Sequence, residues 1–284
     1  MTDAGGVSYV RYPFGDKDNT FKTIPTIVIG SNEHGRIKET SGKGVGGDPA
    51  TPAIISARMI KDLCESVNAN NPFINLLKNN YKLVFCPVIN PWGLSAEALN
   101  NTANYGYNGG YVNSNNVNLD RNFDTPGWGN DSDQRHGAYG GSENETQYFM
   151  NTLAESGAKI AMANHGLGTQ VNATTGEATN AGLCNYMFGR VNSKYNDALT
   201  STGAVMEANY NLSYISYAEA KPEEYAKTRS YIDLIGAEGG AVEMQSREGF
   251  ILAGEGQEYT ARIMEANYTL LLQFLYMIMD KQES

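Results

Sequence analysis

Residues 25–35 read PTIVIGSNEHG, an apolar, β-branched run that is followed at once by polar residues. A strand buried on both faces has this continuous apolar pattern. The pattern recurs in three later segments: residues 82–90 (KLVFCPVIN), 159–164 (KIAMAN) and 240–244 (GAVEM). We therefore predict four buried strands at the centre of the fold.

Helical patterns occupy the chain between and after these strands, in residues 52–67, 142–153, 225–235 and 259–279. Ser142 and Glu145 have the spacing of a capping box at the start of the second helix. Strands that alternate with helices predict an α/β fold with a mixed, mostly parallel twisted sheet and helices on both faces. Because no repeat or linker interrupts the pattern, we expect residues 1–284 to form a single domain.

The charge balance argues against two classes of partner. The 284 residues include 21 Lys and Arg against 31 Asp and Glu, a formal net charge of −10. Such a surface repels phosphate backbones and anionic lipids, so we expect no nucleic-acid and no membrane partner.

No targeting or membrane segment is evident either. Residues 1–18 lack the apolar stretch of a signal peptide. Residues 268–279 are apolar but too short to span a bilayer, and they contain Gln273, so a core helix is the better interpretation. We expect a soluble protein. Its location stays open at this stage, with a cytoplasmic and a virion-associated location as the alternatives.

Residues 100–118 form a segment dense in Asn, Gly and Tyr, with neither strand nor helix periodicity. We predict a long ordered loop here, and loops of that length in compact domains are usually functional. In open α/β folds, ligands bind beyond the carboxyl ends of the strands, so the chemistry is expected there.

Two of the three histidines, His34 and His165, lie just past the ends of two predicted strands. Neutral imidazole is a common zinc ligand, and two such histidines could converge on one ion. A single histidine after a strand is more often a surface residue or one satisfied by hydrogen bonds. The paired placement is what favours the metal interpretation.

Glu243 and Arg121 are the charged residues with candidate roles. Glu243 lies inside an apolar strand, where it could serve as a general base or could face solvent or a salt bridge. Arg121, in the segment VNLDRNF of residues 117–123, could clamp a carboxylate or form a structural corner. The motifs of serine α/β-hydrolases, nucleotide-binding enzymes and zincins are absent from the sequence.

Taken in order, these motifs resemble the zinc carboxypeptidase (metallocarboxypeptidase, funnelin) family, most closely its bacterial and phage-type members. The matching elements are His34-Gly35, Asn90-Pro91-Trp92-Gly93, Val117 to Phe123, Ser142 to Thr146, His165-Gly166 and Glu243. The resemblance covers roughly residues 20–250. It implies a sheet of about eight strands, zinc held by His34 and His165, and Glu243 as the base.

The sequence departs from the family pattern at three places. The family's zinc-ligand Glu falls on Ile37, and an aliphatic side chain cannot bind a metal. Asp120 stands where an Asn helps to hold the terminal carboxylate of the substrate, and Tyr111 stands where the family has its transition-state Arg. We therefore expect weak activity on ordinary carboxypeptidase substrates, because charge at both positions is altered.

The third metal ligand stays open at this stage. Glu39 is the acid nearest to Ile37 in sequence, Asp48 precedes the next helix, and the site could also lack a third protein ligand. Glu39 is the preferred candidate because it is longer and closer to His34.

The resemblance implies a zinc-dependent peptidase or amidohydrolase that uses a metal-activated water with Glu243 as general base. Its substrate would be a peptide or an acylated amino acid, contacted by Arg121, Asp120 and Tyr111. The first alternative is a catalytically degenerate module that binds peptide or glycan. The second is an acyl-amino-acid deacylase of the same fold.

Overall fold

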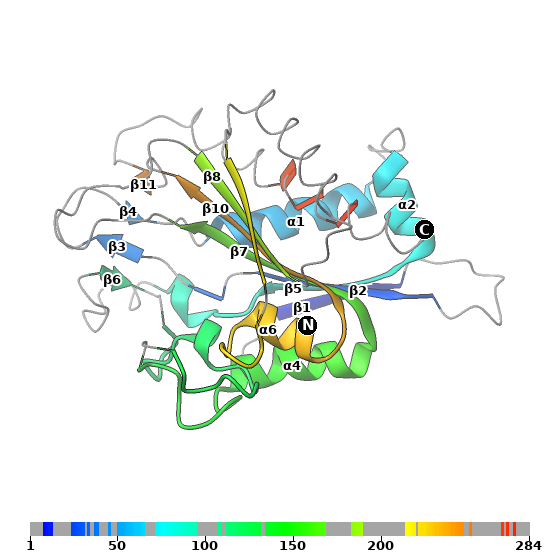
Figure 1. Ribbon diagram of the computed structural model, residues 1–284. Helices are drawn as coiled ribbons and strands as arrows, with labels where there is room; N and C mark the ends of the chain where they lie inside the picture. The colour runs from blue at the N-terminus through cyan, green and yellow to red at the C-terminus, as the bar shows by residue number, and fades with distance from the viewer. Residues whose placement is uncertain are drawn as a thin grey trace.

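The computed structural model describes residues 8–13, 24–31, 33–34, 37–39, 45–46, 50–65, 72–95, 107–109, 112–131, 134–168, 183–189, 214–219, 221–246, 250–251, 268–269, 271–272 and 275–276. Within this part of the chain the architecture is α/β (Figure 1).

A seven-stranded sheet forms the centre of the molecule. Its strands, in spatial order, are β1 (Ser8–Pro13), β5 (Lys82–Val88), β2 (Thr26–Ser31), β7 (Ala158–Gly168), β10 (Glu238–Ser246), β8 (Leu183–Gly189) and β9 (Tyr214–Glu219). The pairs β5–β2, β2–β7, β7–β10 and β8–β9 are parallel, whereas β1–β5 and β10–β8 are antiparallel. The predicted mixed, mostly parallel sheet is confirmed, and the four predicted strands are its contiguous parallel centre.

Helices cover both faces of this sheet, as predicted (Figure 1). Helices α1 (Ala50–Cys64) and α2 (Pro72–Asn80) lie on one face, and α4 (Asn144–Ser156) and α6 (Thr228–Leu234) lie on the other. On α1, the buried residues Ile55, Met59 and Leu63 are spaced four apart and form one stripe toward the sheet. None of the helices in the described part of the chain is long and apolar enough to cross a membrane.

The core beneath α4 fixes the segment that follows the long Asn-rich stretch. Leu119, Phe123 and Phe149 are completely buried there, and the rings of Phe123 and Phe149 meet edge to face with centroids 6.3 Å apart. Because Leu119 and Phe123 bracket Asp120 and Arg121, their burial anchors those two polar residues to the body of the fold.

A second, four-stranded sheet lies beside the first and is built from very short strands: β11 (Phe250–Ile251), β4 (Val45–Gly46), β3 (Ile37–Glu39) and β6 (Tyr107–Gly109). β6 falls inside the segment predicted to be an irregular loop. Three residues are too few to show a period of two, so this strand had no detectable signal.

The predicted capping box at α4 is wrong. The N-cap residue is Glu143, and no side chain caps the helix. The Ser142 hydroxyl instead donates to Glu143 Oε1 at 2.9 Å and accepts a hydrogen bond from the Asn122 amide at 2.9 Å. A tertiary contact has therefore taken the place of the local one.

The pairing of β7 with β10 is interrupted at the carboxyl end of β7. Val242 pairs with Asn164, but Glu243 pairs with Gly166, so His165 is an extra residue in the β7 strand. A bulge of this kind re-aims a side chain and is common next to functional sites.

Candidate metal centre

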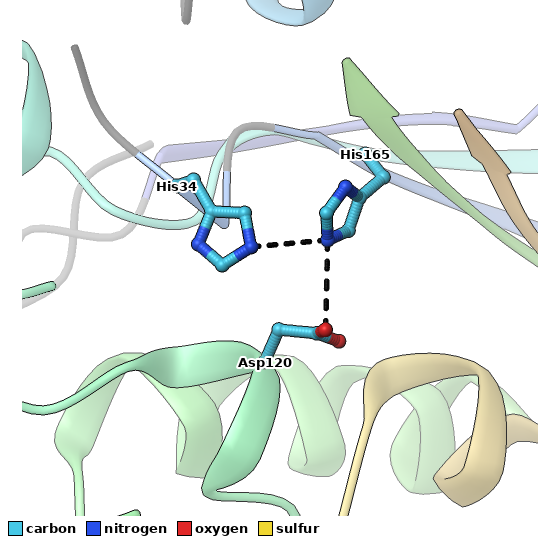
Figure 2. Close-up of side chains that lie close together, drawn as sticks. All are labelled: His34, Asp120 and His165. Atoms are coloured by element: carbon cyan, nitrogen blue, oxygen red, sulfur yellow. Dashed lines mark hydrogen bonds and ion pairs between the residues drawn. The ribbon is translucent and has the colours of Figure 1, made fainter. Parts of the chain in front are cut away.

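Three side chains from three separate elements converge at the carboxyl end of the parallel strands (Figure 2). The Nε2 atoms of His34 and His165 are 3.0 Å apart, and His165 Nε2 is 3.5 Å from Asp120 Oδ2. One ligand atom from each of the three residues lies within 4.8 Å of the others. Among the described residues, this is the group of histidines and carboxylates that could hold a metal ion.

The two histidines meet because their strands are neighbours. β2 and β7 run parallel and stay paired as far as Ser31 and Asn164, so the residues that follow them emerge at the same edge of the sheet. His34 is 8% exposed and its ring meets that of His165 edge to face, with centroids 4.6 Å apart. The predicted approach of these two residues is confirmed.

Asn90, from the motif Asn-Pro-Trp-Gly, holds the turn that carries His34. Its buried amide donates to the carbonyl oxygens of Glu33 at 3.2 Å and of Val112 at 3.1 Å. Its Oδ1 accepts a hydrogen bond from Gly93 N at 2.9 Å. Asn90 thus ties the end of β2 to the segment that leads to Asp120.

Asp120 approaches from the opposite side, on a short 3-10 turn (η3, Leu119–Arg121). The Asn118 side chain caps this turn by accepting from Asp120 N at 3.1 Å. The backbone N–H of Thr228, at the start of α6, donates to Asp120 Oδ1 at 3.2 Å. This contact leaves Oδ2 directed toward the histidines.

Asn122 fastens the other end of this turn. Its Nδ2 donates to the carbonyl oxygens of His136 at 2.8 Å and Tyr139 at 3.1 Å, while its Oδ1 accepts from Glu143 N at 3.0 Å. The turn is therefore held by side-chain hydrogen bonds at both ends, as a preorganised ligand requires.

The electrostatics of the centre keep Asp120 ionised. Burial alone would raise its pKa, but contact with His165 and the positive charge of Arg121 outweigh burial and hold the pKa well below its usual range. A second nearby cation behaves differently: burial lowers the pKa of Lys227 to about 8, although the charge of Asp120 acts in the opposite direction.

Glu33 is a site residue that the sequence analysis missed. It is completely buried, and the nearby side chains of Asp120 and Thr228 both influence its carboxyl group. Burial and the charge of Asp120 raise its pKa well above the usual range. Its position directly before His34 was the available signal, but nothing in the local pattern indicates burial of that acid.

The donor set fits a zinc ion. Two imidazole nitrogens, each about 2.0–2.1 Å from a tetrahedral zinc, lie roughly 3.3 Å apart, close to the observed separation. Two histidines and one carboxylate are a common protein ligand set for a catalytic zinc, which keeps one position open. The buried, ionised carboxylate of Asp120 also adds negative charge that a cation would balance.

The remaining predicted site residues are less fully described. The Glu243 backbone lies in β10 and pairs with Gly166, the residue after His165. The Glu39 backbone lies in β3, while its side chain, together with Tyr111 and Asp48, falls outside the described residues. Arg121, predicted to hold a substrate anion, makes ion pairs with Asp120 and Asp131.

The sequence and the fold are both similar to known proteins. The family model described as zinc carboxypeptidase matches residues 46–255, a range that includes Asp120, His165 and Glu243 but begins after His34. No curated protein matches the chain.

Solved structures share the fold at low sequence identity. Bovine thrombin-activatable fibrinolysis inhibitor, solved with a tick carboxypeptidase inhibitor, is 13% identical with a TM-score of 0.58, covering 90% of this chain and 83% of its own. A metallo-carboxypeptidase from Burkholderia cenocepacia is 12% identical with a TM-score of 0.58, over 97% of this chain and 65% of its own. A metallo-carboxypeptidase from Pseudomonas aeruginosa is 12% identical with a TM-score of 0.52, over 97% and 61%. The chain thus spans less than two thirds of the two bacterial proteins.

Proposed function

Because the chain belongs to the zinc carboxypeptidase family, we propose that it is a zinc-dependent peptidase or amidohydrolase with His34, Asp120 and His165 as ligands. The observation that carries this proposal is the convergence of two imidazoles and an ionised carboxylate from the bend after β2, from β7 and from η3. Each ligand is supplied by a different element, and each element is fixed by its own hydrogen bonds.

Asp120 takes the role that Ile37 cannot fill. The family's third ligand follows the first histidine by three residues, and that position is aliphatic here. A carboxylate reaches the histidines instead from a turn 86 positions after His34, with Oδ2 at 3.5 Å from His165 Nε2. This replacement favours a working metal site over a degenerate one.

When bound, zinc supplies a Lewis acid that polarises a carbonyl group and lowers the pKa of water. The protein's own part is to hold the ligands and to accept a proton. We assign the role of proton acceptor to Glu243, since its backbone pairs with Gly166, the residue after the ligand His165. A glutamate within reach of the attacking water acts as general base.

The substrate class that fits this assignment is a peptide, as the family name implies, with acylated amino acids as the narrower alternative. A peptide- or glycan-binding module without catalysis would use the same ligands but would not need Glu243. The enzymatic alternatives and the binding module are therefore separated by hydrolysis and by the role of this glutamate.

The test compares three proteins: the parent, Glu243→Gln and Glu238→Gln. For each protein it measures the zinc content and the rate of hydrolysis of a panel of peptides and N-acyl amino acids. The control residue Glu238 begins the same strand, at the end remote from the histidines. We expect one zinc per chain in all three proteins and a loss of about 100-fold or more in rate for Glu243→Gln alone.

Two results would contradict this assignment. Hydrolysis by Glu243→Gln at the parental rate would place the base elsewhere. Stoichiometric zinc in a parent that hydrolyses no member of the panel would favour the binding module.

A further inference from the structure

The guanidinium of Arg121 lies between two carboxylates. Its Nη1 is 2.6 Å from Asp120 Oδ2, and its Nε is 2.7 Å from Asp131 Oδ2. All three side chains are largely shielded, with 15%, 6% and 17% of the Arg121, Asp120 and Asp131 side chains exposed. Such partly buried pairs are screened far less by water than surface pairs are.

Arg121 contacts both the carboxylate and the backbone of Asp120. Besides the carboxylate contact, Nη1 donates to the Asp120 carbonyl oxygen at 2.8 Å. The carboxylate oxygen that it contacts is also the one 3.5 Å from His165 Nε2. The orientation of the proposed metal ligand therefore depends on where the guanidinium is held.

Asp131 is held at the end of a loop that docks on the segment before α6. Gly127 N donates to Pro222 O at 2.8 Å, and the Thr125 hydroxyl donates to Tyr225 O at 2.8 Å. A side chain at position 127 would collide with the backbone of Glu224 and Tyr225, so glycine permits this close approach. The loop thus presents the Asp131 carboxylate at a defined place.

Charge gives Asp131 a second effect. A guanidinium beside a metal ligand repels the incoming cation, and a carboxylate on its other side offsets that repulsion. Losing Asp131 would free the guanidinium to move and leave its charge uncompensated. Both changes act against metal binding.

On the basis of the function proposed above, we infer that Asp131 is a positioning residue of the metal centre, acting through Arg121 on the ligand Asp120. Arg121 lies between Asp131 and Asp120 in this series of contacts, so its guanidinium orients the metal ligand. Residues that orient metal ligands typically change metal affinity by 10- to 100-fold when they are replaced.

The experiment measures zinc affinity by competition with a chromogenic chelator for the parent, Asp131→Asn and Glu65→Gln. Glu65 forms an exposed ion pair with Lys61 on α1. The control substitution Glu65→Gln therefore removes one negative charge at a place away from the centre. We expect Asp131→Asn to bind zinc 10- to 100-fold more weakly and Glu65→Gln to match the parent within about twofold. The visible spectrum of the Co²⁺-substituted protein should change in Asp131→Asn alone, because the ligand geometry is altered.

Asp131→Glu tests the same inference without removing charge, and urea unfolding of each variant reports whether it is folded. We expect the glutamate to restore binding to within about threefold of the parent, since the ion pair can re-form. Parental zinc affinity and a parental cobalt spectrum in folded Asp131→Asn would overturn this inference and leave the proposed function standing. A parent that binds no zinc would refute the proposed function and the inference together.

Discussion

Replacing Asp120 by asparagine should weaken zinc binding by about two orders of magnitude. Structural zinc sites with four protein ligands bind with about 10–16 kcal/mol, so one ligand contributes roughly 3 kcal/mol, or about 100-fold. Asp120 is only 4% exposed and its pKa is held low, so the full negative charge is lost in the variant. Asparagine keeps the shape and can still accept the hydrogen bond from Thr228 N.

The assay is competition titration against a chelator of known affinity, with Glu39→Gln and Asp48→Asn as the matched variants. These acids are the rival third ligands that the sequence suggests near His34. We expect both to bind zinc within about threefold of the parent. Urea unfolding accompanies each titration, because Arg121 loses part of its pairing in the Asp120 variant.

The reasoning would be refuted by a folded Asp120→Asn protein with parental zinc affinity. A 100-fold loss in Glu39→Gln instead would identify Glu39 as the third ligand. Parental zinc affinity in all three variants would mean that none of these acids binds the ion and that the two histidines hold it without them.

Three further outcomes follow from the structure. Gly239→Ala should lower the free energy of unfolding by about 3 kcal/mol in urea titration, since φ is +125° and a Cβ would strike the carbonyl oxygen of Ala161; an unchanged midpoint would contradict this. Burial and the charge of Glu143 raise the pKa of Glu145, so ionised Glu145 costs stability as pH rises. Glu145→Gln should therefore be about 0.5 kcal/mol more stable than the parent at pH 7 and equal to it at pH 4, and a gain at both pH values would exclude this cause. Standard peptides with a free C-terminal carboxylate should be hydrolysed no faster than their C-terminal amides, because Arg121 is engaged by two carboxylates; a preference above tenfold for the free acids would show that Arg121 serves the substrate.

The central strands could be predicted because a strand buried on both faces has a continuous apolar sequence. β2 and β5 are continuous apolar runs, and such runs have few other interpretations. The outer strands could not be found in the same way. β1 (SYVRYP) and β9 (YISYAE) mix polar and apolar residues at the two edges of the sheet that the described residues form.

The candidate site likewise has a part that the sequence predicts and a part that it does not. The meeting of His34 and His165 could be predicted, since neighbouring parallel strands deliver their ends to one edge. The position of Asp120 could not, because it depends on a hydrogen bond from Thr228, which lies 108 residues later in sequence. Burial of Glu33 is likewise decided by packing from distant elements, which no local pattern records.

The wide spacing of the proposed ligands would link metal supply to folding. His34 and His165 are 131 residues apart in sequence, with Asp120 between them. An unfolded chain would have to close long loops to bring them together, and the entropy cost of closure means that the native state alone binds the ion tightly. Free zinc at 100 times the dissociation constant would then stabilise the native state by about 2.7 kcal/mol. The melting temperature of this protein would follow the free zinc concentration, so the folded population would itself report metal availability.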